Sequence, residues 1–287
     1  MSAIFEIRNE HLTVTASTLG AELQSVTSAG GTEFLWYGDE AIWSGRAPLL
    51  FPICSGLKND TYTYGGKAYN MKKHGFGKFR DFSGEKLDDH TLCFTLCADE
   101  ETKTQYPFDF VLRVLYTLDG NTIHVRYEVQ NPADTPLYFS IGAHEAYYCP
   151  EGIEEYAIEF DAPQTLDSYL GKDGVLTTEF ERVAENSTRL PLKEAFFEGK
   201  SLIFQDLAFH KAALVHAGSG KRITVDFPDA TYFVLWTIPG APYICLEPWN
   251  GICDVADAGY ALEEKAGIIC VAPGQTETIS HSVTFAD

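Results

Sequence analysis

The sequence has few basic residues for its length. Its 287 residues include 21 Lys and Arg against 41 Asp and Glu, which gives a formal net charge of −20 at pH 7. Most of such a surface would repel a phosphodiester backbone, so we expect no nucleic-acid partner.

The sequence also lacks a long hydrophobic run and a targeting segment. The apolar run at residues 47–54 is far shorter than the ~20 residues that a membrane-spanning helix needs. Residues 1–8 lack the basic-then-apolar layout of a signal peptide. We therefore expect no membrane association and predict a cytoplasmic protein.

Closely spaced cysteine pairs are absent as well. The seven cysteines are scattered and odd in number, and none forms a C-x-x-C motif. This pattern indicates reduced thiols that pack as small apolar residues, and it argues against a zinc site built on cysteine.

No long stretch of the chain repeats apolar residues at helical spacing, so we expect only short helices, around residues 99–104 and 261–265. Short alternating runs broken by Gly, Asn and Ser predict strands, with hairpins over residues 61–70, 110–131 and 212–227. Because no linker or repeat divides the chain, residues 1–287 are predicted to form one all-β domain, a large antiparallel β-sandwich.

Residues 140–148, SIGAHEAYY, surround His144 with small side chains. In a strand, His144 would share a face with Gly142 and Ala146, while Glu145 would point to the opposite face. Small residues beside an imidazole indicate space for a ligand. A histidine hydrogen-bonded within the core explains the stretch equally well.

The segment at residues 72–80 combines a histidine with glycines and basic residues. His74 is followed by Gly75 and Gly77, which would let the backbone approach a ligand, and by Phe76, which offers a flat apolar face. The lysines of the segment fit a solvated strand end or a site for a phosphate on the substrate.

The segment at residues 243–254 places a carboxylate among aromatic rings. Alternation sets Glu247 on the same face as Tyr243 and Trp249. A sugar ring fits this pattern, because its C–H faces stack on aromatic rings and its hydroxyls bond the acid.

Taken in order, these motifs resemble the aldose 1-epimerases (mutarotases), and especially the LacX-like branch. The matching stretches are LFPI at 50–53 with Leu57 and Lys58, HGF at 74–76, YPFDF at 106–110, Asn131, FSIGAH at 139–144, LWT at 235–237 and CLEPW at 245–249. The resemblance covers nearly the whole chain. It implies a galactose mutarotase-like super-sandwich that interconverts the α and β anomers of an aldose.

The resemblance also implies catalytic roles: Glu247 as the general base, His144 as the general acid and His74 as a second histidine that touches the substrate. Ring opening removes a proton from the C1 hydroxyl and adds one to the ring oxygen, so these groups suffice without metal or cofactor. Ordinary pKa values of ~4.3 and ~6.5 would leave Glu247 charged and help to keep His144 protonated beside it. The expected partner is a sugar, and a monomer or a dimer is compatible with the sequence.

The substrate contacts that the resemblance implies involve Trp249, Tyr243, Phe76, Trp236 and Lys58. The chain departs from the family at two places that normally bind sugar hydroxyls. Ser55 and Gly56 stand where many members carry Arg, and Lys200 stands where many carry Asp. The acid and the base are retained, while the identity of the sugar, including a phosphorylated hexose, stays open.

Three other functions fit parts of the sequence. A non-catalytic carbohydrate-binding protein of the same fold fits the two departures, although it would not need both an acid and a base. A metal triad of His74, His144 and Glu247 is a second alternative, but no His-x-Asp or His-x-Glu pair occurs. A glycoside hydrolase would need a second carboxylate, for which Asp254 and Asp257 are available.

Overall fold

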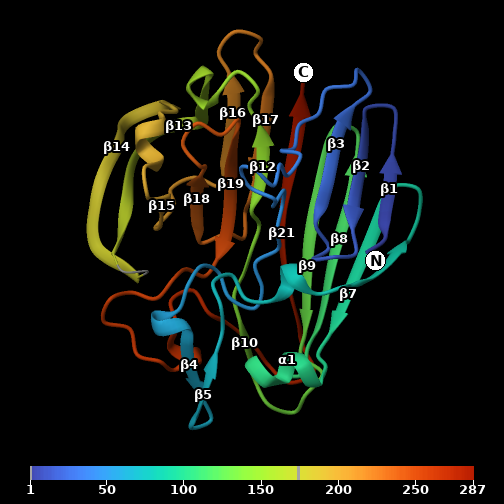
Figure 1. Cartoon of the computed structure of the whole chain (residues 1–287), viewed down its shortest axis with the longest axis vertical. Coiled ribbons are helices and arrows are strands. Elements are labelled where there is room, and N and C mark those ends of the chain that lie inside the picture. The colour runs from blue at the N-terminus through green and yellow to red at the C-terminus, as the bar shows by residue number, and fades with distance from the viewer. Residues whose placement is uncertain (1, 173–174) are drawn as a thin grey trace.

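The computed structural model describes residues 2–172 and 175–287, and over these residues the chain consists mainly of antiparallel strands (Figure 1). Its largest sheet there has nine strands, which in hydrogen-bonding order are β14 (Val175–Pro191), β13 (Tyr156–Lys172), β16 (Lys211–His216), β17 (Arg222–Asp226), β21 (Thr276–Ala286), β9 (Thr122–Gln130), β8 (Val111–Asp119), β7 (Thr91–Cys97) and β6 (Ser83–Lys86). The β8–β9 and β16–β17 pairs confirm two of the predicted hairpins.

A second sheet of five strands packs against the first. Its strands are β11 (Ile141–Gly142), β12 (Glu145–Tyr148), β19 (Tyr243–Asn250), β18 (Tyr232–Trp236) and β15 (Leu202–Phe204). Both β11 and β12 pair with β19, which pairs with β18, and β18 pairs with β15. Figure 1 shows β18 and β19 near the centre of the molecule.

The main hydrophobic core lies between the two sheets. Tyr147 and Leu246 of the five-stranded sheet are buried in the same cluster as Leu112 and Val125 of the nine-stranded sheet. Burial of apolar area on this scale is the dominant force that holds two sheets face to face. The arrangement confirms the predicted all-β antiparallel sandwich.

Smaller sheets complete the fold in the described residues. They are β1 (Ile4–Arg8), β2 (Leu12–Ser17) and β3 (Leu23–Ser28); β4 (Thr61–Tyr64) and β5 (Lys67–Asn70); and β10 (Leu137–Phe139) with β20 (Ile269–Val271). The β4–β5 hairpin confirms the third predicted hairpin. Gly65 and Gly66 form its turn with φ of 55° and 76°, a backbone conformation that glycine adopts without strain.

Helices are short, as predicted. The α-helix of the described residues is α1 (Glu100–Gln105), and the short 3₁₀ turns lie at Lys58–Asp60, Gly77–Phe79, Ile153–Glu155, Glu194–Phe197 and Leu262–Glu264. Asp99 and Thr102 cap α1 reciprocally, because each side chain accepts a hydrogen bond from the other's backbone N–H, at 2.7 and 2.9 Å. None of the helices in the described part of the chain is long and apolar enough to cross a membrane.

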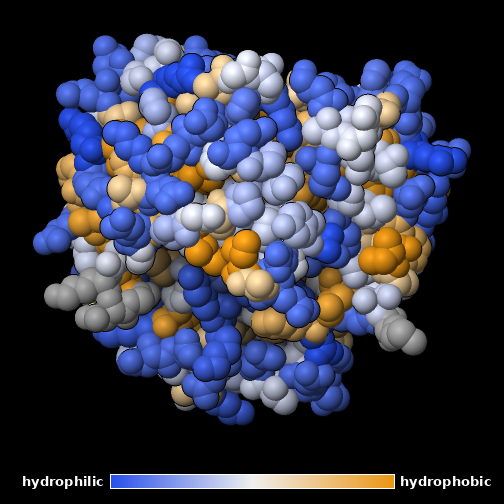
Figure 2. Space-filling view, turned by 45° about the horizontal axis from the view of Figure 1, so that its top comes forward, coloured by the Kyte–Doolittle hydropathy of each residue, from blue (hydrophilic) through white to orange (hydrophobic). Residues whose placement is uncertain are grey.

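Hydrophobic residues on the face of the molecule in Figure 2 lie in separate small groups among hydrophilic ones.

All seven cysteines are free thiols, and five are buried as predicted. Cys97 and Cys270 are exposed, so for these two the prediction of apolar packing was wrong.

Candidate active site

The strand register of the five-stranded sheet brings His144 and Glu247 together. Gly142 pairs with Trp249 and Glu145 pairs with Leu246, so the same register sets His144 directly opposite Glu247. Side chains opposite each other on antiparallel strands lie on one face of the sheet and touch. Nε2 of His144 lies 3.4 Å from Oε2 of Glu247.

A proline in the central strand explains why the predicted strand at residues 140–148 is interrupted. The N–H of Ala143 bonds the carbonyl of Pro248 at 3.1 Å, but Pro248 has no N–H to return. The carbonyl of Ala143 instead accepts a hydrogen bond from the indole N–H of Trp249 at 3.0 Å. The break therefore leaves the Ala143 carbonyl available to orient Trp249.

The alternation predicted for residues 243–249 is confirmed. Ile244 and Leu246 belong to the main core, whereas Tyr243 and Cys245 belong to a separate cluster with Trp36 on the other face. The same holds for the histidine stretch, because Glu145 bonds His281 of β21 at 3.0 Å and so faces the core. His144 and Glu247 thus share the face that the core does not cover.

A cavity of about 330 Å³ lies on this face. Its lining residues in the described part of the chain are Trp43, Pro48, Ser55, Lys73, His74, Lys78, His144, Ser201, Ile203, Val234, Trp236, Ile238, Glu247 and Trp249. It brings together the three predicted catalytic residues and two of the predicted tryptophans. A cavity with apolar walls and a few convergent polar groups is the usual form of a small-molecule site.

His74 enters the cavity from a strained turn. Its φ of 69° and the φ of 58° at Ser55 lie in the left-handed region that non-glycine residues rarely adopt. Two hydrogen bonds hold them there: the N–H of His74 bonds the Ser55 carbonyl at 2.7 Å, and the N–H of Ser55 bonds Nδ1 of His74 at 3.1 Å. Because Nδ1 accepts, the neutral ring carries its proton on Nε2.

Burial changes the ionisation expected for these groups. Burial raises the pKa of Glu247 well above its usual value of 4.5, although the charge of Lys73 opposes this. Burial lowers the pKa of His144 to about 3, and it lowers that of His74 well below 6.5, with His144 adding to the effect. The expectation of ordinary pKa values was therefore wrong, because both side chains of the pair are almost fully withdrawn from water.

We expected the small residues near His144 to leave space for a ligand. At Gly142 this expectation was wrong, because the space is filled by the protein. A Cβ at Gly142 would lie 2.5 Å from Cδ1 of Trp249. The glycine therefore makes room for the indole, not for a ligand. Gly75 likewise lies against the carbonyl of Phe51, 2.3 Å from where its Cβ would be, so this close backbone approach is to the protein itself.

We expect Gly142→Ala to destabilise the fold by about 1–3 kcal/mol, because the added methyl overlaps Trp249. Urea unfolding followed by tryptophan fluorescence measures this change. Gly199→Ala is a poor control because its φ is 69°, whereas Gly171→Ala adds a methyl in ordinary van der Waals contact. Equal stability of the Gly142 and Gly171 variants would contradict the packing argument.

Three predicted substrate contacts lie outside the cavity lining. Phe76 is buried against Phe51 in the core, with ring centroids 6.1 Å apart. Tyr243 lies behind the lining, where its ring stacks on Trp43 at 5.4 Å. The Lys58 amine bonds the carbonyl of Ala256 at 3.4 Å. These positions give the three side chains packing or tethering roles.

Sequence reasoning missed several lining residues. Trp43 stacks on the His144 ring, with ring centroids 5.3 Å apart and 30° between the planes. Ile203 lies in β15, and Ser201 directly precedes that strand. The aromatic-rich run at residues 34–43 was the available signal for Trp43. Lys200, beside Ser201, turns away and bonds Glu181 at 2.6 Å.

A metal-binding arrangement in the described residues differs from the predicted triad. Ligand atoms of His144, Cys245 and Glu247 lie within 4.8 Å of one another, and His74 is not part of this group. Burial raises the pKa of the Cys245 thiol well above its usual value. A protonated thiol is a weaker metal ligand than a thiolate.

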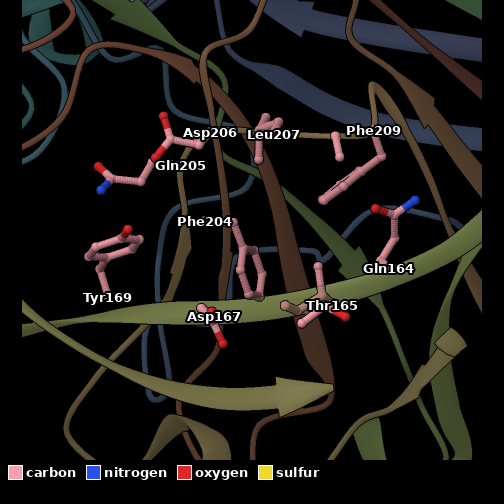
Figure 3. A pocket seen from close by; sticks show the side chains of 11 residues that line it. Gln164, Thr165, Asp167, Tyr169, Phe204, Gln205, Asp206, Leu207 and Phe209 are labelled. Atoms are coloured by element: carbon pink, nitrogen blue, oxygen red, sulfur yellow. The ribbon is translucent and has the colours of Figure 1, made fainter. Parts of the chain in front are cut away.

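A second hollow of about 200 Å³ lies on the opposite face of β15, where Phe204 lines it beside Gln164 and Tyr169 (Figure 3). Asp167 and Asp206 bring carboxylates to this hollow, but its described lining contains no imidazole. It therefore lacks the paired acid and base of the larger cavity.

Comparison with known proteins places the chain in a family. Residues 3–283 match the model of the aldose 1-epimerases, so the chain belongs to this family. This membership supports a role as a sugar epimerase or mutarotase, an enzyme of the isomerase class.

Individual relatives agree with this assignment. The chain is 32% identical over 294 residues to the plasmid-borne protein LacX of Lactococcus lactis subsp. lactis, with 98% of each chain covered. Its fold matches a galactose mutarotase related enzyme from Lactobacillus acidophilus with a TM-score of 0.94 and 32% identity over 99% of this chain and 98% of that one. A galactose mutarotase-like protein from Lactobacillus casei matches with a TM-score of 0.93 and 28% identity over 99% and 100% of the two chains.

Proposed function

We propose that the protein is a metal-independent mutarotase that interconverts the α and β anomers of an aldose by opening and reclosing its ring. The observation that carries the proposal is the His144–Glu247 pair, 3.4 Å apart in a cavity lined by three tryptophans. In this reaction one group takes the proton of the C1 hydroxyl while the other protonates the ring oxygen. The C1 to ring-oxygen bond then breaks, and rotation about C1–C2 before reclosure yields the other anomer.

The proton balance of the pair fits a reaction that runs equally in both directions. Neutral His144 beside protonated Glu247 holds the same number of protons as imidazolium beside carboxylate. Burial favours the first form, since it separates no charge. A bound sugar that donates a hydroxyl to Glu247 favours the second, in which Glu247 is the base and His144 the acid. Reclosure returns both protons, so the pair needs no exchange with solvent.

The other lining residues serve binding. The indoles of Trp249 and Trp236 offer faces for the C–H side of a pyranose. Neutral His74, with Nε2–H as donor, suits a sugar hydroxyl or the ring oxygen as acceptor. His74 lies 5.6 Å from the His144 ring, which puts this donor beside the proposed reaction centre.

A glycoside hydrolase fits the cavity less well. Glu247 is the one carboxylate among its described lining residues. Asp254 is buried elsewhere, where it accepts from the Lys265 amine at 2.6 Å, and Asp257 is exposed. The mechanism of that class requires two carboxyl groups on either side of the scissile bond.

Anomer exchange measured directly tests the proposal. Polarimetry on freshly dissolved α-glucose and α-galactose, extended by exchange NMR to a panel of free and 6-phosphorylated hexoses, should show acceleration over the uncatalysed rate. No acceleration with any sugar, together with measurable sugar binding, would instead support a carbohydrate-binding protein of this fold.

On its acid side, the pH profile of kcat/KM is expected to stay flat until the pH approaches the pKa of His144, which is about 3. The pKa of His144 is about 3 and that of Glu247 is raised, so the pair gains a second proton only in strong acid and loses its last proton only well above pH 4.5. Initial exchange rates in buffers of constant ionic strength check this. A loss of activity as the pH falls through ~4.3 would show an ordinary carboxyl group in the pair and contradict the burial argument.

A further inference from the structure

Two lysines in the cavity lining have no acidic partner among the described residues. Lys73 and Lys78 both line the cavity, and no carboxylate of that part of the chain forms a salt bridge with either. Their neighbours are paired: Lys72 contacts Asp60 at 3.0 Å, and Arg80 contacts Asp99 and Glu101. In a chain of net charge −20, acidic partners are plentiful, so two lysines that line a cavity without a salt bridge to the described residues favour an anionic ligand there.

The position of Lys78 strengthens this reading. Its side chain is half-buried, and burial together with the charge of Lys73 lowers its pKa, while the charge of Glu22 opposes this. A half-buried cation without a salt bridge is destabilised, and an anionic ligand would relieve that cost. Both lysines line the same cavity as His144 and Glu247.

The hydrogen-bonding groups of the cavity also favour an anionic ligand. Its described lining contains no Asp, Asn or Gln, and Glu247 is already committed to the reaction. The remaining polar groups are mainly hydrogen-bond donors. The two amines and the His74 N–H donate only, and the two serine hydroxyls both donate and accept. Sugar hydroxyls are best met by acceptors as well as donors, whereas a phosphate ester offers acceptors alone.

We propose that the substrate is a sugar phosphate whose phosphate group binds between Lys73 and Lys78 while its pyranose ring lies at His144 and Glu247. This inference rests on the proposed mutarotase function. A phosphate monoester carries about −1.5 to −2 charges near neutrality, which matches two lysines. Anomer exchange needs a free C1 hydroxyl, so the phosphate is on another carbon, and the exocyclic C6 gives it the greatest reach. A kinase or phosphotransferase acting at C6 of a free hexose would supply such a substrate.

The first test compares kcat/KM for glucose and galactose with that for their 6-phosphates, by exchange NMR on the full chain. We expect the 6-phosphates to be preferred by at least about 10- to 100-fold, an advantage that shrinks as ionic strength rises from about 20 to about 200 mM. Lys73→Gln and Lys78→Gln should each reduce this preference by about tenfold or more. Lys72→Gln is the matched control, because Lys72 is exposed and paired outside the cavity, and it should keep the preference.

The outcomes separate the two proposals. Active exchange of free sugars with equal or lower kcat/KM for the 6-phosphates would overturn the phosphate inference and leave the mutarotase function standing. Preference for glucuronate over glucose 6-phosphate would overturn it in favour of a carboxylate ligand. If no sugar is exchanged, calorimetry with 1,5-anhydroglucitol 6-phosphate, which has no anomeric hydroxyl, still tests the phosphate subsite. Binding no tighter than that of 1,5-anhydroglucitol would then overturn the inference as well.

Discussion

Glu247→Gln should slow enzymatic anomer exchange by about 10²–10⁴-fold while sugar binding survives. The amide has nearly the shape of the carboxyl group but neither takes nor gives a proton at this step. Stopped-flow polarimetry or exchange NMR gives the rate, and calorimetry with a non-exchanging 1,5-anhydro sugar gives the affinity. Glu264→Gln, at an exposed glutamate away from the cavity, is the matched control and should keep full activity. Wild-type rates in the Glu247 variant would sink the proposed mechanism.

Measuring the free energy of unfolding of the same variant separates a loss of catalysis from a loss of folding. The folded-state pKa of Glu247 is raised, so above about pH 4.5 the unfolded chain releases a proton that the folded chain keeps. Wild-type stability therefore falls as pH rises from that point, and the Gln variant escapes this loss. We expect the free energy of unfolding of Glu247→Gln to exceed that of the wild type at pH 7, and this difference to disappear near pH 4. The opposite trend with pH would contradict the raised pKa.

His144→Asn should cost a similar ~10²–10⁴-fold in kcat/KM, because it removes the group proposed to protonate the ring oxygen. The double variant with Glu247→Gln should be little slower than either single variant, since the acid and the base act in one concerted proton relay and neither works alone. His124→Asn, on an exposed face of β9, is the matched control. Losses that simply multiply in the double variant would show that the two side chains contribute independently and would argue against a shared relay.

The pKa values of His144 and Glu247 depend on the side chains that surround the pair. Trp43 covers the His144 ring, and Trp249 is held by the Ala143 carbonyl that Pro248 leaves unpaired. These contacts keep water from both groups and so produce the opposed pKa shifts. A site of this kind exchanges protons with its ligand more readily than with solvent, which suits a reaction without net proton uptake.

Much of the local structure could be read from the sequence. Alternation placed Tyr243, Glu247 and Trp249 on one face of a strand, and a hairpin was predicted over residues 61–70, because both patterns depend on residues only a few positions apart. The motif order also indicated the family, and with it the three side chains that meet in the cavity.

Only the tertiary structure decided how those side chains are surrounded. The register between β12 and β19 sets His144 against Glu247, and the packing of Trp43 over them removes the water that would have kept their pKa values ordinary. Packing also took Phe76 into the core and left Lys73 and Lys78 in the cavity without a salt bridge to any of the described residues. A side chain's chemical type and the face it occupies are local properties of the sequence. Its hydration, charge and neighbours depend on segments far away in the chain, and these come together only when the two sheets pack.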